Sequence, residues 1–360
     1  MRLVKSHYGN ANYQHAVISL TEPGAVGAQM RALGIEVYAM GMRSAVEVPY
    51  IMWRLVRLIR ALRPGVVQTW MYHGDLLGGL AARLAGCNSV IWGIRSSDLA
   101  GSGARSTEWV RALCAALSHR IPRFIVCVAE ASRRIHVALG YRADRMVVIQ
   151  NGFDLAQLHA TNIDAAVFRS ACGFSVDDVV VGSLGRFNHD KDQHNFVRAA
   201  SLVGLQFPQV RFLMVGRNCD SNNMELMAWI GAAGLSDRFV LLGERSDVLI
   251  CLAAMDVFCL SSRSEAFPNV VGEAMGMGIP CVVTDVGDVA MLVADTGVVV
   301  PRENSVALAF GLGRLLAMTA DERQMLGLRA RARVYAEFSM DRTRERFESI
   351  YQRIARKERT

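Results

Sequence analysis

A strand, a polar turn and a helix follow one another in residues 257–273, which run Val257-Phe-Cys-Leu-Ser-Ser-Arg-Ser-Glu-Ala-Phe-Pro-Asn-Val-Val-Gly-Glu273. The apolar run Val257–Leu260 is typical of a buried strand and ends at a Ser-rich turn. Pro268 stands where the first turn of a helix tolerates a missing N–H, so we expect a helix to begin there. This order of elements predicts one βα unit of a parallel sheet.

The same pattern recurs in both halves of the chain, where each apolar run is followed by a Gly, polar or Ser-rich turn and then by a helical pattern. In the second half the expected strands are Val179–Leu184, Val210–Val215, Phe239–Leu242, Val257–Leu260 and Cys281–Thr284. In the first half they are Ala16–Leu20, Ile35–Tyr38, Val66–Thr69, Val90–Gly93, Phe124–Val128 and Met146–Ile149. The sequence therefore predicts an α/β fold with two parallel sheets.

The length of 360 residues suggests two domains, because one domain typically has about 150 residues. Asn151-Gly152-Phe153-Asp154 is a turn signal, and the polar residues from there to Asp178 contain no obvious strand. We therefore expect an N-terminal domain over residues 1–165 and a C-terminal domain over residues 166–335. Residues 336–360 form a last segment, in which Phe347, Ile350, Tyr351 and Ile354 repeat with helical spacing, so this amphipathic helix needs a surface to cover.

The composition is that of a globular protein without a membrane span, a secretion signal or a disulfide framework. Apolar residues make up 52% of the chain and charged residues 20%, which is typical of a globular protein. There is no apolar run of about 18 residues and no signal-peptide pattern, so we expect a cytoplasmic location. The eight cysteines form no C-x-x-C pair and lie mostly in apolar runs, which indicates buried thiols. Residues 1–160 contain 18 Lys and Arg against 9 Asp and Glu, and this basic half suggests an anionic substrate or surface.

The residues after the strand Val257–Leu260 are the strongest candidate site. The backbone amides of Phe267, Asn269 and Val270 are expected near a helix N-terminus, where unsatisfied donors and the helix dipole favour an anion such as phosphate. Glu265 and Glu273 flank this position, and carboxylates there suit the hydroxyl groups of a sugar and a ribose. The alternative is an ordinary first-turn acid at Glu273 and a solvated loop charge at Glu265.

A second candidate follows the strand Val179–Leu184, in the run Gly182-Ser-Leu-Gly185-Arg186-Phe-Asn-His-Asp-Lys191. Gly185 lets the backbone approach a ligand, and the cations of Arg186 and Lys191 are placed to hold a diphosphate. A solvated surface turn is the alternative. Both candidates follow strands of the same half, and ligands of open α/β sheets bind outside the carboxyl ends of the strands, which favours one shared site.

A divalent-metal site is an alternative at Asp190-Lys191-Asp192, with His189 and His194 beside it. We do not expect a metal, because the lysine cation in the middle would oppose one. The patterns of zinc proteases, α/β-hydrolases and Walker-type nucleotide binding are absent from the sequence, and no cofactor is indicated.

Two residues of the first half are candidates by their position. His73 follows the strand Val66–Thr69 and is expected to face a cleft between the domains, whereas a lone histidine more often has a structural role. Arg95 follows the strand Val90–Gly93 and would meet either phosphate or solvent.

A basic helix is expected between Pro49 and Pro64. Arg54, Arg57 and Arg60 centre on the face opposite its apolar residues. This is a helix packed on the core with a solvated basic side, or a surface attracted to anionic lipid headgroups at about 1 kcal/mol per cation. A nucleic-acid partner is not expected, because no basic groove with interleaved aromatic residues is present.

With these residues identified, the chain resembles glycosyltransferase family 4, the retaining nucleotide-sugar enzymes of GT-B architecture, in which two Rossmann-like domains face a cleft. The resemblance spans nearly the whole chain. It rests on Gly185-Arg186 with Lys191, on the Glu265-x7-Glu273 pair, on Glu273-Ala-Met followed by Gly278-x-Pro280, and on Thr284-Asp-Val-Gly287.

The resemblance implies that Arg186 and Lys191 hold the diphosphate of a nucleotide-sugar donor, that Glu265 contacts the donor sugar and that Glu273 binds the ribose hydroxyls. It implies that His73 faces the reacting sugar, that the last helix crosses back onto the first domain, and that the acceptor is a glycan or a lipid-linked molecule of surface polysaccharide biosynthesis. The donor sugar, the base and the acceptor stay open. A nucleotide-sugar epimerase of the same fold and a non-catalytic peripheral membrane protein are the alternatives.

One departure concerns the start of the chain. Family members usually begin with an apolar strand and a Gly-rich loop, whereas this chain opens with Met1-Arg-Leu-Val-Lys-Ser-His-Tyr-Gly-Asn, which is typical of the end of the following helix. The first βα element is therefore expected to be missing. Either the start codon is placed too late, or the protein is truncated and has an unpaired strand edge in its first sheet.

Overall fold

The computed structural model describes residues 2–97, 105–158 and 161–357, which divide into two α/β units. The first unit comprises Met1–Gly152 together with Met340–Thr360, and the second comprises Phe153–Ser339. The chain enters the second unit before the boundary predicted near residue 165. The reason is that part of the expected linker forms helix α7 (Asn162–Ala171), which packs on α10 (Val248–Ala253) of the second unit.

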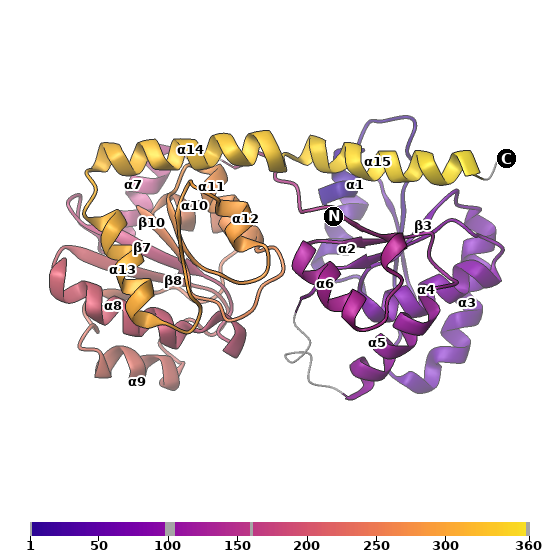
Figure 1. Ribbon diagram of the computed structural model, residues 1–360, viewed down its shortest axis with the longest axis horizontal. Helices are drawn as coiled ribbons and strands as arrows, with labels where there is room; N and C mark the ends of the chain where they lie inside the picture. The colour runs from indigo at the N-terminus through magenta and orange to yellow at the C-terminus, as the bar shows by residue number, and fades with distance from the viewer. Residues whose placement is uncertain (1, 98–104, 159–160, 358–360) are drawn as a thin grey trace. The chain divides into compact units, whose positions relative to one another are not determined.

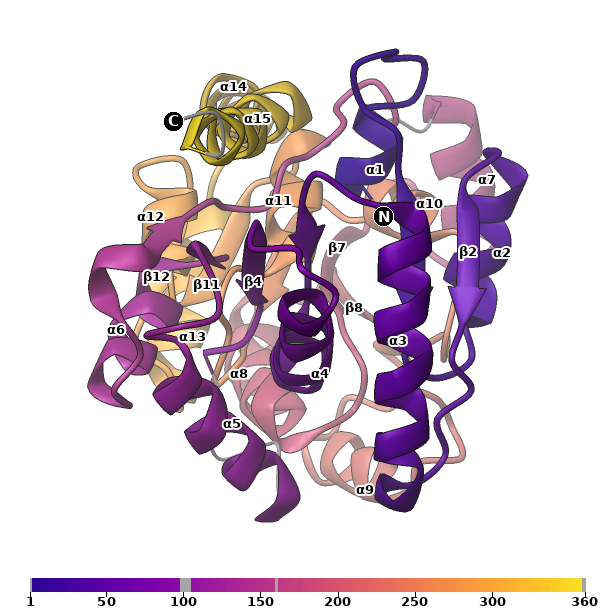
Figure 2. The same ribbon diagram turned by 90° about the vertical axis from the view of Figure 1, so that its right-hand side faces the viewer.

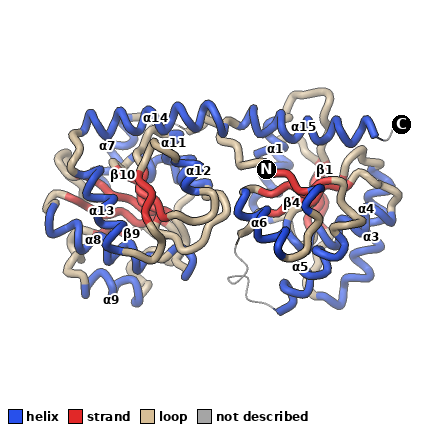
Figure 3. The backbone as a smooth tube through the Cα atoms, viewed as in Figure 1, coloured by secondary structure: helices blue, strands red, loops and turns tan. Residues whose placement is uncertain are grey.

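The second unit is built on a six-stranded parallel sheet in the order β12-β11-β10-β7-β8-β9. Figure 3 shows the strands of this unit in red, with helices in blue around them. Its strands are β7 (Val179–Leu184), β8 (Val210–Val215), β9 (Phe239–Leu241), β10 (Val257–Leu260), β11 (Cys281–Thr284) and β12 (Val298–Val300). Besides α7 and α10 its helices are the short 3-10 helix η3 (His189–Lys191), α8 (Gln193–Gln206), α9 (Met224–Ala232), α11 (Asn269–Gly276), α12 (Val289–Val293), α13 (Ser305–Leu316) and α14 (Ala320–Phe338). Five of the strands were predicted and β12 was not.

Helices cover both faces of this sheet, and α8, α9 and α13 lie on one side of it while α11 and α14 lie on the other (Figure 1). Val181 and Phe212 belong to the cluster that includes Phe196 of α8 and Leu308 of α13. Because strand side chains alternate between faces, the neighbouring residues of β7 and β8 point to the other layer. Strands buried on both faces explain why β7, β8 and β10 are nearly continuous apolar runs.

The first unit contains two separate parallel sheets, one of β1-β2 and one in the order β3-β4-β5-β6. The strands are β1 (Ala16–Ser19), β2 (Glu36–Ala39), β3 (Val67–Gln68), β4 (Val90–Ile94), β5 (Phe124–Cys127) and β6 (Met146–Val148). The helices are α1 (Arg2–Ser6), α2 (Gly24–Ala32), α3 (Val48–Leu62), α4 (Met71–Leu84), α5 (Arg105–Leu117), α6 (Glu130–Ala138) and α15 (Met340–Lys357), with short 3-10 helices η1 (Ala45–Glu47) and η2 (Ala143–Arg145).

Neighbouring residues of β4 show the two layers of this unit. Trp92 packs with the cluster formed by α3, α4 and α5, whereas Ile91 packs with Phe347, Ile350 and Ile354 of α15. The apolar stripe of the last helix therefore covers the sheet of the first unit. The prediction of two Rossmann-like parallel-sheet units is confirmed, with the difference that the first sheet is divided.

Candidate functional site

The strongest candidate site lies where β7 and β10 end in the second unit. These two strands are neighbours in the sheet, so the turns that follow them meet at its carboxyl edge. There the Lys191 ammonium forms an ion pair with a carboxylate oxygen of Glu265, and both side chains are mostly buried. The structure thus brings together two residues that are 74 positions apart and that the sequence predicted separately.

A second ion pair fixes the turn that holds Glu265. Arg263 Nη2 donates to Asp192 Oδ1 at 3.1 Å, and this interaction raises the pKa of Arg263. Asp192 also caps α8, accepting from the Asn195 amide at 3.3 Å. The pair therefore ties the turn after β10 to the start of α8, next to Lys191. This role of Asp192 and Arg263 was not predicted from the sequence, although both residues lie within the two motifs that follow β7 and β10.

Serine side chains add to the same network. The Ser262 hydroxyl donates to Glu265 Oε1 at 2.8 Å, and the Ser261 hydroxyl donates to the backbone carbonyl of Lys191 at 2.9 Å. Both serines are almost fully buried, with 1–2% of their surface exposed. Because these buried hydrogen bonds fix the positions of Lys191 and Glu265, the two residues are ordered in the absence of a ligand.

Helix α11 begins beside this pair, with Pro268 at its N-cap and Asn269 and Val270 as its first two residues. Their amides therefore belong to the first turn, as the sequence predicted. Phe267 precedes the helix, and its buried ring stacks on Phe153 at 6.3 Å between ring centres. Only the backbone of Phe267 is thus available to the site. Glu273 lies on the second turn of α11 and is partly buried.

A glycine allows the turn after β10 to pack closely. Gly287 has φ +56, and a side chain on it would collide with the backbone carbonyls of Glu265 and Ala266. The Asp288 amide donates to the Ala266 carbonyl at 3.0 Å. The Thr284-Asp-Val-Gly287 segment therefore has a physical role, because a larger residue at position 287 would displace Glu265.

Arg186 is the exposed cation of the site. It follows β7 through Gly185, which lies next to the Lys191 side chain. The backbone carbonyl of Arg186 accepts from the side-chain amide of Gln193 at 2.9 Å. Within the described part of the chain no side-chain hydrogen bond or ion pair is found for its guanidinium. Arg186 is therefore available to a negatively charged ligand at this edge.

The metal alternative finds no group of ligands here. Asp192 is engaged by Arg263, and the ring of His194 packs on Trp229 at 4.8 Å. Across residues 2–97, 105–158 and 161–357 there is no group of three or more His, Cys, Asp or Glu side chains placed to hold a metal ion.

His73 and Arg95 belong to the first unit, so they do not enter the geometry described for the second. His73 is exposed on the first turn of α4. Arg95 lies over the Trp70 ring at 5.3 Å and donates to Asn151. Burial and the nearby Arg2 lower the pKa of Arg95 to about 10, which still leaves it charged at neutral pH.

The basic face of α3 differs from its prediction. Arg54 donates to the carbonyls of Met40 at 2.9 Å and Ala39 at 3.4 Å, and Arg60 donates to the Leu84 carbonyl at 2.8 Å, so both side chains are held against the backbone while they keep their positive charge. Arg57 instead stacks on the exposed Trp53 at 4.7 Å. No described helix is long and apolar enough to cross a membrane.

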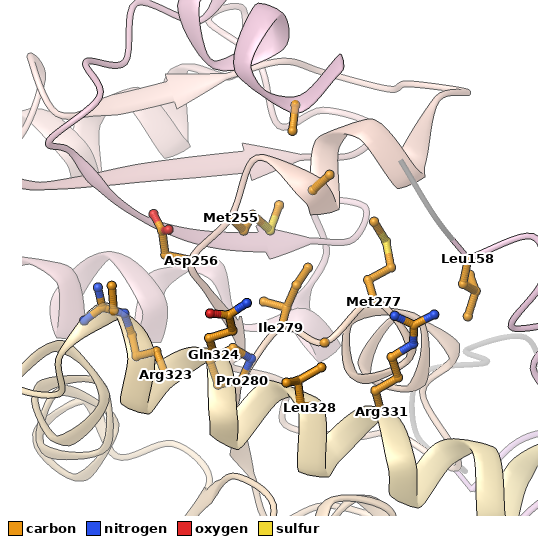
Figure 4. Close-up of a pocket in the computed structure, with 14 residues that line it drawn as sticks. Leu158, Met255, Asp256, Met277, Ile279, Pro280, Arg323, Gln324, Leu328 and Arg331 are labelled. Atoms are coloured by element: carbon orange, nitrogen blue, oxygen red, sulfur yellow. The ribbon is translucent and has the colours of Figure 1, made fainter. Parts of the chain in front are cut away.

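A pocket of about 550 Å³ lies elsewhere in the second unit (Figure 4). Asp256 and Pro280 line it, and they precede β10 and β11, so the pocket lies at the end of these strands opposite to Glu265. Its Asp256 is already paired with Arg169 at 3.0 Å, and its Arg323 already donates to the Met318 carbonyl at 2.6 Å. The pocket is therefore separate from the candidate site.

Solved structures share the fold of the whole chain. The Anabaena protein HepE, in complex with UDP and glucose, superposes with a TM-score of 0.83 at 21% identity, covering 97% of this chain and 93% of HepE. Sucrose-phosphate synthase from Thermosynechococcus elongatus gives a TM-score of 0.73 at 18% identity, covering 94% of this chain and 98% of that one. The fold is thus that of GT-B glycosyltransferase structures.

Curated relatives are similar to this chain over 64% of its length. The UDP-Gal:alpha-D-GlcNAc-diphosphoundecaprenol alpha-1,3-galactosyltransferase of Escherichia coli is 25% identical over 235 residues, and the D-inositol 3-phosphate glycosyltransferase of Mycobacterium bovis is 30% identical over 238. The matched part spans 60% and 48% of the length of these two relatives. Residues 4–157 match the family model described as Glycosyltransferase Family 4, and residues 178–318 match the one described as Glycosyl transferases group 1. The chain therefore contains a Glycosyltransferase Family 4 domain followed by a Glycosyl transferases group 1 domain.

Proposed function

We propose that this protein is a retaining glycosyltransferase that moves a sugar from a nucleotide-sugar donor to a glycan or lipid-linked acceptor in surface polysaccharide biosynthesis. The observation that supports this most is the Lys191–Glu265 pair at the carboxyl edge of β7 and β10, with the exposed Arg186 and the first turn of α11 beside it. HepE is similar in fold and is seen with UDP-glucose, and the Escherichia coli relative is named for a diphosphoundecaprenol acceptor.

In this proposal the donor diphosphate binds between Arg186, Lys191 and the α11 amides. Lys191 is neutralised by Glu265 when no ligand is bound, and a diphosphate brings two negative charges that Lys191 and Arg186 share. Glu265 then accepts hydrogen bonds from hydroxyls of the donor sugar, and Glu273 accepts them from the ribose. Each carboxylate is thereby occupied by hydroxyl donors instead of facing the phosphate oxygens unpaired.

The chemistry follows from the leaving group. The bond between the sugar anomeric carbon and the diphosphate oxygen breaks, and the acceptor hydroxyl oxygen bonds to that carbon, on the same face in the retaining outcome that we propose. Its proton goes to the departing diphosphate. Negative charge grows on the diphosphate while the sugar becomes oxocarbenium-like, so the cations of Arg186 and Lys191 bind the transition state more tightly than the donor. We assign donor binding to the second unit, and acceptor binding, with His73 and Arg95, to the first.

The donor site is tested by Arg186→Ala and Glu273→Ala. We expect Arg186→Ala to lower turnover about 100-fold or more, which is typical of losing one charge-stabilising donor, and Glu273→Ala to weaken nucleotide binding. The measurements are release of nucleoside diphosphate from a panel of nucleotide sugars and the thermal shift that each donor produces. Arg217→Ala, which removes an exposed arginine from the turn after the neighbouring strand β8, is the matched control. Equal activity and equal binding in all variants would refute the proposal, and an epimerised sugar formed without acceptor would indicate the epimerase instead.

We further propose that the first unit contacts an anionic membrane surface through α3 and the residues before it. Val46, Tyr50 and Trp53 are exposed by 88%, 58% and 54%, and Arg57 stacks on Trp53. Exposed aromatic rings next to a cation are typical of a helix that lies at a membrane interface. This surface adds exposed aromatic residues to the predicted basic one, and Arg57 is the cation beside them, whereas Arg54 and Arg60 donate to backbone carbonyls.

Vesicle sedimentation tests this contact. Vesicles with anionic lipid should retain the wild type, and Trp53→Ala combined with Arg57→Glu should release it, since both the apolar and the charged contributions are lost. Arg120→Glu changes the charge equally at an exposed position outside α3 and should bind like the wild type. If Trp53→Ala with Arg57→Glu sediments as the wild type does, α3 is not the membrane surface.

A further inference from the structure

The pocket of the second unit lies at the edge of the sheet opposite to Glu265. The turns before β10 and β11 line this cavity of about 550 Å³ from one side, and α14 lines it from the other (Figure 4). In Figure 2, where α14 is seen end-on, α11 lies beside it, and the two helices are in contact. A cavity of this size is typical of a site for a small molecule.

Contacts within the chain fix the distance between α14 and the turn before β11. Gly327 of α14 lies directly against Gly278, so a Cβ atom on Gly327 would collide with the Gly278 carbonyl. The start of α14 is fixed as well, because Thr319 and Glu322 form a capping box there. The shape of the pocket is therefore set by the fold.

The arginines of α14 differ in what they bind. Three of them bond to acceptors of the second unit, namely Arg323 to the Met318 carbonyl, Arg329 to the Asp295 carboxylate and Arg333 to the Leu292 carbonyl. For Arg331, which is exposed and lines the pocket, no hydrogen bond or ion pair is found among the residues that the structure describes. Its side chain extends from α14 toward Met277 (Figure 4). The planar guanidinium of Arg331 is thus available to a carboxylate or a phosphate group.

Asp256 provides an acceptor at the other end of the pocket (Figure 4). Its Oδ2 accepts from Arg169 at 3.0 Å and from the Val180 amide at 2.7 Å. Its Oδ1 has no partner in the described ranges of the chain, and 34% of the side chain is exposed. Because the pair with Arg169 balances the charge of Asp256, Oδ1 is available to a hydroxyl group of a ligand.

The lining between these two ends is mixed. Ile279 and Leu328 are apolar, and Gln324 adds a side-chain amide (Figure 4). A ring with both C–H and O–H groups matches this lining, whereas a purely apolar molecule would leave Gln324 and Asp256 without partners. A cationic molecule is disfavoured, because Arg323 and Arg331 both line the pocket.

We propose that this pocket binds a small organic anion that carries hydroxyl groups. Arg331 binds the anionic group, and a hydroxyl group at the far end of the molecule donates to Asp256. Sugar phosphates and sugar acids share this chemistry. The site is independent of the proposed donor chemistry, since it uses neither Arg186 nor Lys191.

NMR of the methionine methyl groups tests the site in the full chain. Met255 and Met277 line the pocket, whereas Met325 is 60% exposed on α14 and does not line it. The probes are glucose 1-phosphate, glucuronate and, as a neutral molecule of similar size, methyl glucoside. At least one of the two anions should shift the Met255 and Met277 signals in a saturable way and leave Met325 unchanged. Methyl glucoside should bind about tenfold more weakly or less, because it forms no charge-assisted bond with Arg331.

The two anions distinguish the source of the negative charge. Saturation by glucose 1-phosphate alone assigns the pocket to phosphate esters, and saturation by glucuronate alone assigns it to sugar acids. The proposal is overturned if neither anion shifts Met255 and Met277 at millimolar concentration, or if methyl glucoside binds as tightly as the anions.

Three variants test which residues bind the anion. Arg331→Gln should weaken binding about tenfold or more. Arg329→Gln makes the same change on the same helix outside the pocket and should bind like the wild type. Arg186→Ala should also bind like the wild type, which separates this pocket from the proposed donor site. Wild-type affinity in Arg331→Gln overturns the proposal, and so does loss of the Met255 and Met277 shifts in Arg186→Ala, whereas failure of the donor proposal would leave these shifts unchanged.

Discussion

Asp75 is a buried carboxyl group of the first unit that the sequence analysis did not identify as special. It is 1% exposed, and its Oδ1 accepts from the Thr69 hydroxyl at 2.5 Å and from the Gly93 amide at 3.2 Å. These bonds hold the turn between β3 and α4, and Met71, the first residue of α4, has the strained φ of +67. Burial raises the pKa of Asp75 to about 8, so the group is largely neutral at pH 7.

The raised pKa predicts how stability changes with pH. Unfolded Asp75 ionises near its ordinary value of 3.8, whereas folded Asp75 stays protonated up to about pH 8. Between these values the folded state binds more protons than the unfolded state, so stability falls as pH rises, by at most about 1.4 kcal/mol per pH unit from this group. Urea unfolding at pH 5, 6, 7 and 8 measures how the free energy of unfolding changes with pH. The Asp75→Asn substitution should remove the contribution of Asp75 to this change.

The control for this prediction is Asp177→Asn, which replaces an exposed carboxylate of the second unit. It should unfold with the wild-type dependence on pH. A wild-type and an Asp75→Asn protein that lose stability equally between pH 5 and 8 would show that Asp75 is ionised in the folded chain.

The residues of the second-unit site could be named from the sequence, because their motifs follow strands whose carboxyl ends meet by topology alone. Their pairing could not, since the Lys191–Glu265 and Arg263–Asp192 pairs depend on how two turns pack. The same limit applies to Arg54, which helical spacing assigned to a free basic face. The structure shows it bonded to backbone carbonyls, and these are acceptors that a sequence pattern does not show.

At the level of secondary structure, the long apolar runs predicted the positions of their strands, whereas some short elements were not predicted. Strand β12 has three residues and follows Gly297, too short for a pattern to separate it from a loop. Helix α7 lies in a polar stretch, and only its Thr161 cap, which accepts from the Asp164 amide, marks its start. The division of the first sheet is a consequence of pairing between distant segments, which no local pattern contains.

Helix α15 follows the second unit in the sequence but packs in the first unit. The first unit therefore depends on the C-terminal end of the chain for its stability. Phe347 is 2% exposed and contacts the layer of Ile91 and Val126. Phe347→Ala removes this ring and should cost about 3–5 kcal/mol, which is typical of a large-to-small change in a core. The loss should fall on the first unit, since the residues of α15 are absent from the core cluster of the second.

Tryptophan fluorescence can follow the first unit, because four of the five tryptophans lie in it and Trp229→Phe removes the other. In that background Phe347→Ala should lower the urea midpoint of the fluorescence transition. The rise in melting temperature that a nucleotide donor produces reports the second unit, and it should persist in Phe347→Ala. Phe310→Ala is the control, because Phe310 is 71% exposed on α13 and its loss should leave the fluorescence transition unchanged. An unchanged midpoint in Phe347→Ala would mean that α15 does not stabilise the first sheet, and a lost donor response would mean that the two units unfold as one.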